Sequence, residues 1–217
     1  MKIKNIFFDF DGVIAESVNV KTEAFHKMYL PYGKEIAAKV VEHHKKNSGI
    51  SRFEKFKLYH KKYLNIELNK KEISELAEEF SKLVKIGVIQ SRLVSGVKEF
   101  LKRYSNIINF WIISATPTAE MKEIVKAKNL KEYFLGVFGS PQKKSYWVKK
   151  IINENQSNLN SFLFIGDSMS DYNAAVENKI RFALRNTDEN RIIFYNKKDI
   201  IRFNDFFEFE NIVQDFI

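Results

Sequence analysis

The sequence predicts an α/β protein with a doubly wound parallel sheet and an inserted all-helical domain. The first observation is a short apolar run at 3–8, which reads as a strand and has no strand partner nearby in the sequence. The second is the alternation of strand-like and helical segments from residue 107 onward, which is typical of a parallel sheet covered on both faces. The third is the region 16–92, which reads as helices throughout.

The predicted elements follow one another in a definite order. Within 16–92, Ser51-Arg52-Phe53-Glu54 is a capping-box pattern that begins one helix, and Asn69-Lys70-Lys71-Glu72 begins another. Later strands are expected at 107–114, 161–165 and 181–184, and helices at 118–129, 145–155 and 170–178. The first strand is expected to join the later sheet. This gives a Rossmann-like core domain of residues 1–15 and 93–217 and a helical cap of residues 16–92.

The composition excludes several classes of protein. With 217 residues, 45% of them hydrophobic, and only 8 Gly and 3 Pro, the chain has the apolar content of a folded core, unlike a disordered or collagen-like protein. The absence of Cys excludes a disulfide framework, a thiolate zinc site and a cysteine nucleophile. No apolar run approaches the roughly 18 residues that span a bilayer, and acids interrupt the N-terminal apolar stretch. A cytoplasmic protein without a membrane partner is expected.

The net charge of +9 is concentrated in the helical region, where 16 basic residues stand against 10 acidic ones. Its lysines occur as scattered pairs mixed with glutamates, without a DNA-recognition helix or an aromatic RNA-binding motif. This pattern favours a solvated surface over a nucleic-acid interface.

Chemically active residues stand directly after the predicted strands, where open parallel sheets bind their ligands. The four groups are Asp9-Phe10-Asp11-Gly12-Val13, Ser114-Ala115-Thr116-Pro117, Lys143-Lys144 and Gly166-Asp167-Ser168-Met169-Ser170-Asp171. Carboxylates spaced i and i+2 around a turn can hold a divalent cation, and Mg²⁺ prefers oxygen ligands together with substrate phosphate. An aspartate can also act as a nucleophile towards phosphorus, while lysine and hydroxyl groups stabilise the transferring phosphoryl group.

These four groups resemble the four motifs of the haloacid dehalogenase (HAD) superfamily. Phe8 to Val13 reads F-D-F-D-G-V, and Gly166 to Asp171 reads G-D-S-x-x-D. The helical insertion after the first motif resembles the C1 cap of the branch that contains phosphoglycolate phosphatase and β-phosphoglucomutase. The resemblance covers essentially the whole chain in order and type, although the cap matches only in position and helicity. It implies an HAD-like core, Mg²⁺ as cofactor and a phosphoric monoester hydrolase of the HAD type.

The resemblance assigns a role to each aspartate. Asp9 is implied as the nucleophile and a Mg²⁺ ligand. Asp11 is implied as the general acid/base, with its backbone carbonyl on the metal. Asp167 is implied as a further Mg²⁺ ligand, and Asp171 supports the metal site.

The resemblance also implies a phosphoryl-binding set. Ser114 and backbone N–H groups near Ala115 would hold the phosphoryl group. The motif lysine is expected to be Lys144, because the following Ser145 makes a good helix N-cap, and Lys143 is the alternative. The family often has proline at the position of Ser145.

Asp11 determines the reaction that is expected. Dehalogenases of this superfamily lack the second aspartate, whereas a phosphatase needs an acid for the leaving group. The expected function is a Mg²⁺-dependent phosphatase acting on a small sugar phosphate or phosphorylated acid through an aspartyl-phosphate. The alternatives are a phosphomutase of the β-phosphoglucomutase type and a non-catalytic phospho-ligand binding protein. A receiver domain is discounted because it needs no helical insertion, and no cap lysine stands out for phosphonoacetaldehyde hydrolysis.

The cap offers one candidate for substrate recognition. Arg52, at the start of a helix, is expected to bind substrate, with packing over a helix face as the alternative. Glu16 is expected at the junction of core and cap, as a hinge contact or a functional acid. The histidines at positions 26, 43, 44 and 60 are expected to be surface or satisfied residues. Trp111 and the Phe-rich stretch 203–209 are expected in the core, and the oligomeric state, monomer or dimer, is left open.

Overall fold

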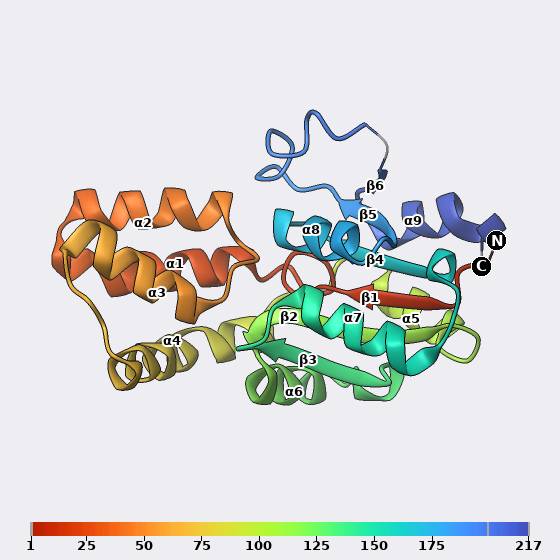
Figure 1. Cartoon of the computed structure of the whole chain (residues 1–217), viewed down its shortest axis with the longest axis horizontal. Coiled ribbons are helices and arrows are strands. Elements are labelled where there is room, and N and C mark those ends of the chain that lie inside the picture. Colours follow the sequence, from red (N-terminus) through yellow and green to blue (C-terminus); the bar gives the residue numbers. More distant parts are fainter. Residues whose placement is uncertain (1, 199, 217) are drawn as a thin grey trace.

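The structure is a computed structural model that describes residues 2–198 and 200–216. Its centre is a six-stranded parallel sheet in the order β3-β2-β1-β4-β5-β6 (Figure 1). The strands are β1 (Asn5–Phe8), β2 (Asn109–Pro117), β3 (Gly136–Ser140), β4 (Phe162–Gly166), β5 (Arg181–Arg185) and β6 (Ile201–Phe203). The predicted fold class is confirmed.

Strand β1 lies in the middle of the sheet. Its four residues are buried, and they pair with Asn109–Ile112 of β2 on one side and Phe162–Ile165 of β4 on the other. An uninterrupted apolar run is what a central parallel strand requires, because helices cover both of its faces. The first strand therefore joins the later sheet, as the sequence predicts.

Alternate side chains of β1 enter two separate apolar layers. Phe8 packs edge-on against Phe110 with ring centroids 5.3 Å apart, whereas Phe7 stacks on Phe162 at 5.6 Å. The layer of Phe8 is covered by α5 (Val97–Tyr104), α6 (Thr118–Ala127) and α9 (Phe206–Val213). The layer of Phe7 is covered by α7 (Lys144–Asn155) and α8 (Met169–Glu177). Short helices η3 (Lys131–Tyr133), η4 (Leu159–Ser161) and η5 (Gln214–Phe216) complete this part of the chain.

The helices between Val18 and Gln90 form a separate lobe beside the carboxyl ends of the strands (Figure 1), and we refer to them as the cap. They are α1 (Val18–Tyr29), η1 (Leu30–Tyr32), α2 (Lys34–Lys46), α3 (Arg52–Tyr59), η2 (His60–Leu64) and α4 (Lys70–Gln90). Aromatic side chains fill the inside of the cap: Phe25, Tyr29, Phe56, Tyr59 and Phe80.

The predicted helix starts in the cap are present. The Ser51 side chain accepts a hydrogen bond from the Glu54 N–H, and Asn69 forms a reciprocal capping box with Glu72. The helix from Arg52 does not stop at Tyr59 but continues as the π-helical segment η2. The chain leaves it through Asn65, which has a left-handed backbone (φ 56°) that asparagine tolerates.

The two chain segments that enter and leave the cap run side by side. Ala15 and Leu93 form an antiparallel bridge. The Glu16 N–H donates to the Arg92 carbonyl at 2.9 Å, and the Val94 N–H donates to the Ile14 carbonyl at 3.0 Å. A two-stranded connection therefore joins the cap to the sheet.

Several elements differ from the sequence prediction. Strands β3 and β6 and helices α5 and α9 were not predicted. β3 contains two glycines and β6 has only three residues, so both lack the apolar run of a central strand. The predicted N-cap at Ser145 is wrong: α7 begins at Lys144, and the Lys143 carbonyl accepts from the N–H groups of the first turn.

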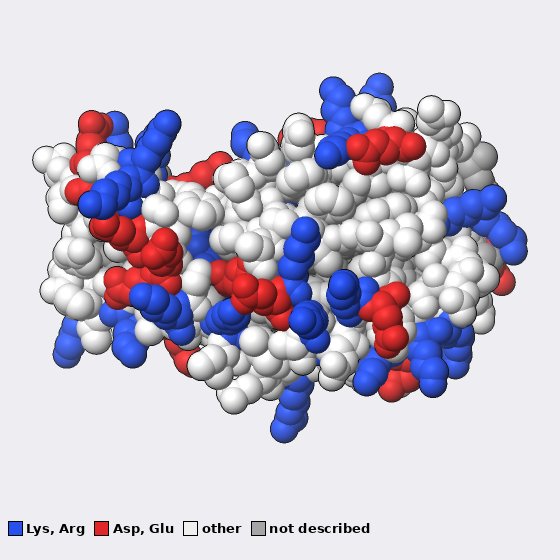
Figure 2. Space-filling model, turned by 90° about the horizontal axis from the view of Figure 1, so that it is seen from below, with Lys and Arg blue, Asp and Glu red and all other residues white. Residues whose placement is uncertain are grey.

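The Phe-rich C-terminal stretch is largely core, as predicted. Phe203, Phe206 and Phe209 are buried, while Phe207 is half exposed. Trp111 is also buried. On the face shown in Figure 2, lysines and arginines are interspersed with aspartates and glutamates over both cap and sheet domain. Within residues 2–198 and 200–216, no helix combines the length and the apolar character needed to cross a bilayer.

Candidate active site

All the predicted site residues except Arg52 meet at the carboxyl edge of the sheet. Asp9 and Asp11 follow β1, and Ser114 and Ala115 lie near the end of β2. Asp167 follows β4, Asp171 lies in the first turn of α8, and Lys144 begins α7. Because β2, β1 and β4 are neighbours in the sheet, their ends bring these segments to one place.

Three aspartates form a buried carboxylate cluster around one lysine. Oxygens of Asp9, Asp167 and Asp171 lie within 4.8 Å of one another. The Lys144 ammonium lies 2.9 Å from Asp9 Oδ2 and 2.6 Å from Asp171 Oδ1. Asp171 is held further by the hydroxyl of Ser168, which donates to its Oδ2 at 2.6 Å. Lys144 rather than Lys143 therefore faces the carboxylates.

The cluster carries more negative charge than Lys144 balances. Burial raises the pKa of Asp9 to about 7, against the lowering effect of Lys144, and repulsion from Asp171 and Asp11 adds to the rise. Burial together with Asp9 and Asp171 raises the pKa of Asp167 well above its usual range. Burial lowers the pKa of Lys144, but the charges of Asp171 and Asp9 outweigh it and raise that pKa. A cation beside these carboxylates would relieve the repulsion.

The donor set fits a magnesium ion. Its members are buried oxygen ligands, which Mg²⁺ prefers. In the part of the chain that the structure describes, no basic side chain lies within ion-pair distance of Asp167, so its carboxylate is free to act as a ligand.

A lysine that the sequence analysis missed contacts Asp11. Lys21 of α1 donates to the Asp11 carboxylate and, at 2.7 Å, to the hydroxyl of Thr116. The hydroxyl of Ser17 donates to the same carboxylate at 2.6 Å. Burial raises the pKa of Asp11, but Lys21, Ser17 and Lys144 outweigh it and lower that pKa below its usual range. No motif in the sequence singles out Lys21, because its contact depends on how α1 is placed over β1.

Ser114 lines a cavity between the sheet and the cap. The cavity has a volume of about 210 Å³, and its walls include Ala115, Lys144 and the cap residues Gly49 and Ile50. The Ser114 hydroxyl accepts a hydrogen bond from the Thr116 N–H at 3.1 Å. Lys144, which contacts Asp9, lines this cavity, whereas Asp9 itself lines the smaller space under the cap described below.

Arg52 lies in a different place from the one predicted. Its side chain is buried and forms two 2.8 Å hydrogen bonds with the carboxylate of Glu120 in α6, and it also donates to Ser81. The guanidinium carbon of Arg52 lies 4.7 Å from the centroid of the Phe80 ring. The expected substrate contact is corrected accordingly: the guanidinium is occupied by a carboxylate of the core, so it connects the two parts of the protein.

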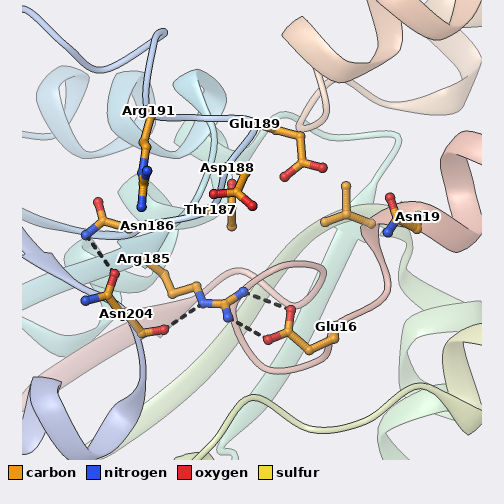
Figure 3. A pocket seen from close by; sticks show the side chains of 10 residues that line it. Glu16, Asn19, Arg185, Asn186, Thr187, Asp188, Glu189, Arg191 and Asn204 are labelled. Atoms are coloured by element: carbon orange, nitrogen blue, oxygen red, sulfur yellow. Dashed lines mark hydrogen bonds and ion pairs between the residues drawn. The ribbon is translucent and has the colours of Figure 1, made fainter.

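Glu16 also connects cap and core. Arg185 of β5 donates to both of its carboxylate oxygens, at 2.9 and 2.5 Å, and to the Gly12 carbonyl at 3.1 Å. Figure 3 shows this pair at the edge of a cleft of about 400 Å³, with Asp188 and Arg191 around it. Of the two roles expected for Glu16, this geometry favours the hinge contact.

A loop of the cap closes directly over the carboxylates. A Cβ placed on Gly49 would lie 2.1 Å from Ser170 Oγ and 2.3 Å from Ser168 Oγ, so a larger residue here would force Ser168 and Ser170 to shift. The remaining space between Asp9, Asp11 and Asp167 and the cap side chains is about 20 Å³. The structure therefore shows the cap closed.

Comparison with known proteins identifies the family. The haloacid dehalogenase-like hydrolase family profile matches residues 6–184. The chain belongs to this family, so it is a hydrolase of the HAD type, and the resemblance stated from its motifs is confirmed. No curated protein sequence matches it significantly.

Solved structures share the fold at low identity. A predicted phosphoglycolate phosphatase from Haemophilus somnus is 20% identical, with a TM-score of 0.75 and 99% of each chain covered. CbbY from Rhodobacter sphaeroides, in complex with xylulose-(1,5)bisphosphate, is 13% identical, with a TM-score of 0.72 over 94% of this chain and 95% of its own. The HAD-hydrolase YfnB from Bacillus subtilis, bound to magnesium, is 13% identical, with a TM-score of 0.69 over 99% of this chain and 100% of its own.

Proposed function

We propose that this protein is a Mg²⁺-dependent phosphatase that hydrolyses a small phosphorylated metabolite through an aspartyl-phosphate on Asp9. The observation that carries the proposal is the contact of Lys144 with Asp9 inside the buried cluster that Asp9 forms with Asp167 and Asp171. The second carboxylate, Asp11, follows Asp9 two positions later in the chain. A buried nucleophile, a fixed cation and a nearby second carboxylate are the parts that phosphoryl transfer requires.

The residues divide the reaction into two steps. In the first step an oxygen of Asp9 bonds to phosphorus, the bond from phosphorus to the leaving oxygen breaks, and Asp11 gives that oxygen a proton. In the second step Asp11 takes a proton from water, which attacks phosphorus, releases phosphate and restores Asp9. Lys144 and Ser114 hold the phosphoryl oxygens in both steps.

The carboxylates of Asp9 and Asp167 and the backbone carbonyl of Asp11 would hold Mg²⁺, with Asp171 in support. The metal supplies positive charge that offsets the repulsion between Asp9 and the phosphate. Lys21 lowers the pKa of Asp11 in the closed structure. Asp11 therefore donates a proton only after Lys21 has moved away from it, which we expect when substrate enters.

The similar structures support the choice of metal and substrate class. One of them contains magnesium and another a sugar bisphosphate. The small cavity at Ser114 suits a small metabolite better than a macromolecule.

The test is phosphate release from a panel of phosphorylated sugars, acids and nucleotides, with and without Mg²⁺. Wild-type protein and Asp9→Asn are compared, with Asp188→Asn as a control at an exposed aspartate. We expect metal-dependent release that Asp9→Asn abolishes and Asp188→Asn retains. Release that survives Asp9→Asn would refute the assigned nucleophile, and conversion to an isomeric phosphate without free phosphate would indicate a mutase.

A further inference from the structure

Two buried side chains of the cap form a hydrogen-bonded pair above the carboxylates. His44 of α2 and Lys55 of α3 are 2% and 1% exposed. The Lys55 ammonium lies 2.7 Å from His44 Nδ1 and 3.3 Å from the Ser48 carbonyl. The ring of Phe25 packs against both of them.

The pair lacks two of the partners that buried polar groups normally have. In the described part of the chain, no carboxylate lies within ion-pair distance of Lys55, and Nε2 of His44 is buried without any hydrogen-bond partner. Buried polar atoms are nearly always hydrogen-bonded, so each exception needs an explanation. His44 also lines the small cavity whose other wall is Asp9, Asp11 and Asp167. The orphaned atom therefore belongs to a side chain of the site.

The orientation of the pair defines what it can bind. An ammonium group only donates hydrogen bonds, so with Lys55 protonated, Nδ1 of His44 accepts and the ring proton lies on Nε2. Nε2 is then a donor with a positive charge directly behind it. The complementary ligand atom is an anionic oxygen.

The electrostatics of the cavity show what a bound anion would change, because without one burial disfavours the protonated forms of Lys55 and His44. Burial lowers the pKa of Lys55 far below its usual range, and the charges of Lys21 and Lys144 lower it further, against the attraction of Asp11. Burial and Lys55 likewise lower the pKa of His44. An anion bound beside Nε2 would offset these penalties.

We propose that His44 and Lys55 form the substrate-recognition pair of the cap and bind a carboxylate on the leaving group of a phosphorylated acid. This inference rests on the proposed phosphatase function. The phosphoryl group would lie on the side of Asp9 and Lys144, which leaves the rest of the substrate facing the cap. The closed space there is about 20 Å³, so among phosphorylated acids a two- or three-carbon acid would displace the cap least.

The test compares substrates that differ only in this charge. Phosphoglycolate is paired with ethylene glycol monophosphate, 3-phosphoglycerate is paired with glycerol 3-phosphate, and p-nitrophenyl phosphate reports the basal chemistry. The Mg²⁺-loaded wild type is compared with Lys55→Met and His44→Phe, which keep size and packing. Lys39→Met removes an exposed lysine of the same lobe and serves as the matched control.

We expect the wild type to favour at least one acid over its uncharged counterpart. Lys55→Met and His44→Phe should lower kcat/KM for that acid by about ten- to a hundredfold. The kcat/KM values for its counterpart without the carboxylate and for p-nitrophenyl phosphate should stay within about threefold of wild type. Binding of the same acid to Asp9→Asn, measured by calorimetry, should weaken by a similar factor when Lys55→Met is added.

Four outcomes would overturn the proposal. A wild type that prefers the uncharged member of both pairs excludes a carboxylate at the cap. An equal loss on all substrates, with a lowered melting temperature, means that the pair is structural. If p-nitrophenyl phosphate and every metabolite remain intact, the phosphatase function itself fails, whereas turnover of p-nitrophenyl phosphate without acid preference refutes only the recognition pair.

Discussion

The guanidinium of Arg52 and the carboxylate of Glu120 form a buried ion pair with two 2.8 Å hydrogen bonds across the boundary between cap and core. Arg52→Met should lower the free energy of unfolding by about 3 kcal/mol, because it leaves a buried carboxylate without its cation. The double variant Arg52→Met/Glu120→Leu should recover most of that loss. Urea denaturation measures both. A rise in KM with unchanged stability would instead restore Arg52 as a substrate contact.

The contact of Lys144 with Asp9 and Asp171 predicts a large loss of activity on substitution. Lys144→Met should lower kcat by about 10²–10³-fold, because the transferring phosphoryl group loses a buried cation. Lys143→Met, at the neighbouring position, should stay within about threefold of wild type. Steady-state kinetics of both variants on the best substrate measures these losses. A larger loss of kcat in Lys143→Met than in Lys144→Met would make Lys143 the motif lysine.

The carboxylate cluster predicts stabilisation by magnesium. At about a hundredfold excess over its dissociation constant, Mg²⁺ should raise the melting temperature by about 5–10 °C, since a ligand that binds only the folded state adds its binding free energy to stability. Asp167→Asn should raise the melting temperature without metal and remove most of the magnesium effect. Asp188→Asn should change neither. An unchanged magnesium shift in Asp167→Asn would contradict the assignment of that ligand.

The close approach of Gly49 to Ser168 and Ser170 predicts that closure fails when a methyl group is added. Gly49→Ala should lower kcat/KM by about tenfold or more for small substrates, because the loop cannot reach the carboxylates without a clash. The free energy of unfolding should change by less than about 1 kcal/mol, since the clash exists only in the closed state. Small-angle scattering should show a larger radius of gyration, and a variant as compact and active as wild type would disprove the steric role.

The lowered pKa of Lys55 predicts a specific pH dependence of stability. Between that lowered pKa and the ordinary value of 10.5, the unfolded chain binds a proton that the folded chain does not. Stability therefore rises with pH across this window, by up to about 1.4 kcal/mol per pH unit. Lys55→Met should be more stable than wild type at pH 7, and the difference should shrink towards pH 10. Urea denaturation at both pH values tests this, and a constant difference would exclude titration of Lys55.

The order of the motifs along the chain was sufficient to predict the core of the fold and the candidate site. Asp9 and Asp167 each follow a strand, Ser114 lies near the end of β2, and parallel strands bring their carboxyl ends to one edge whatever the loops do. Lys144 contacts Asp9 and Asp171, but the reason for choosing it was wrong, since Lys143 and not Ser145 precedes the helix. The edge strand β3 was not predicted, because its short, glycine-containing segment lacks an apolar run.

The contacts between cap and core were beyond reach of the sequence. Lys21, Arg52 and His44 lie on helical patterns that say which face is apolar but not which part of the core that face meets. Arg52 was expected at the substrate and pairs with Glu120 instead. His44 was expected to be exposed or satisfied, and its Nε2 is buried without a partner. Such contacts depend on the placement of one lobe on another, which local propensity does not encode.

The paired segments at Ala15 and Leu93 restrict how the cap opens. The two hydrogen-bonded segments side by side form a ribbon, which bends out of its own plane more easily than it twists. The cap should therefore open and close about one axis, and every closure should bring the same face onto the sheet. Residues such as Gly49 and His44 would then meet the carboxylates in one registered position, with no search among orientations. Selectivity in such a protein is carried by a repeatable trajectory as much as by the shape of a pocket.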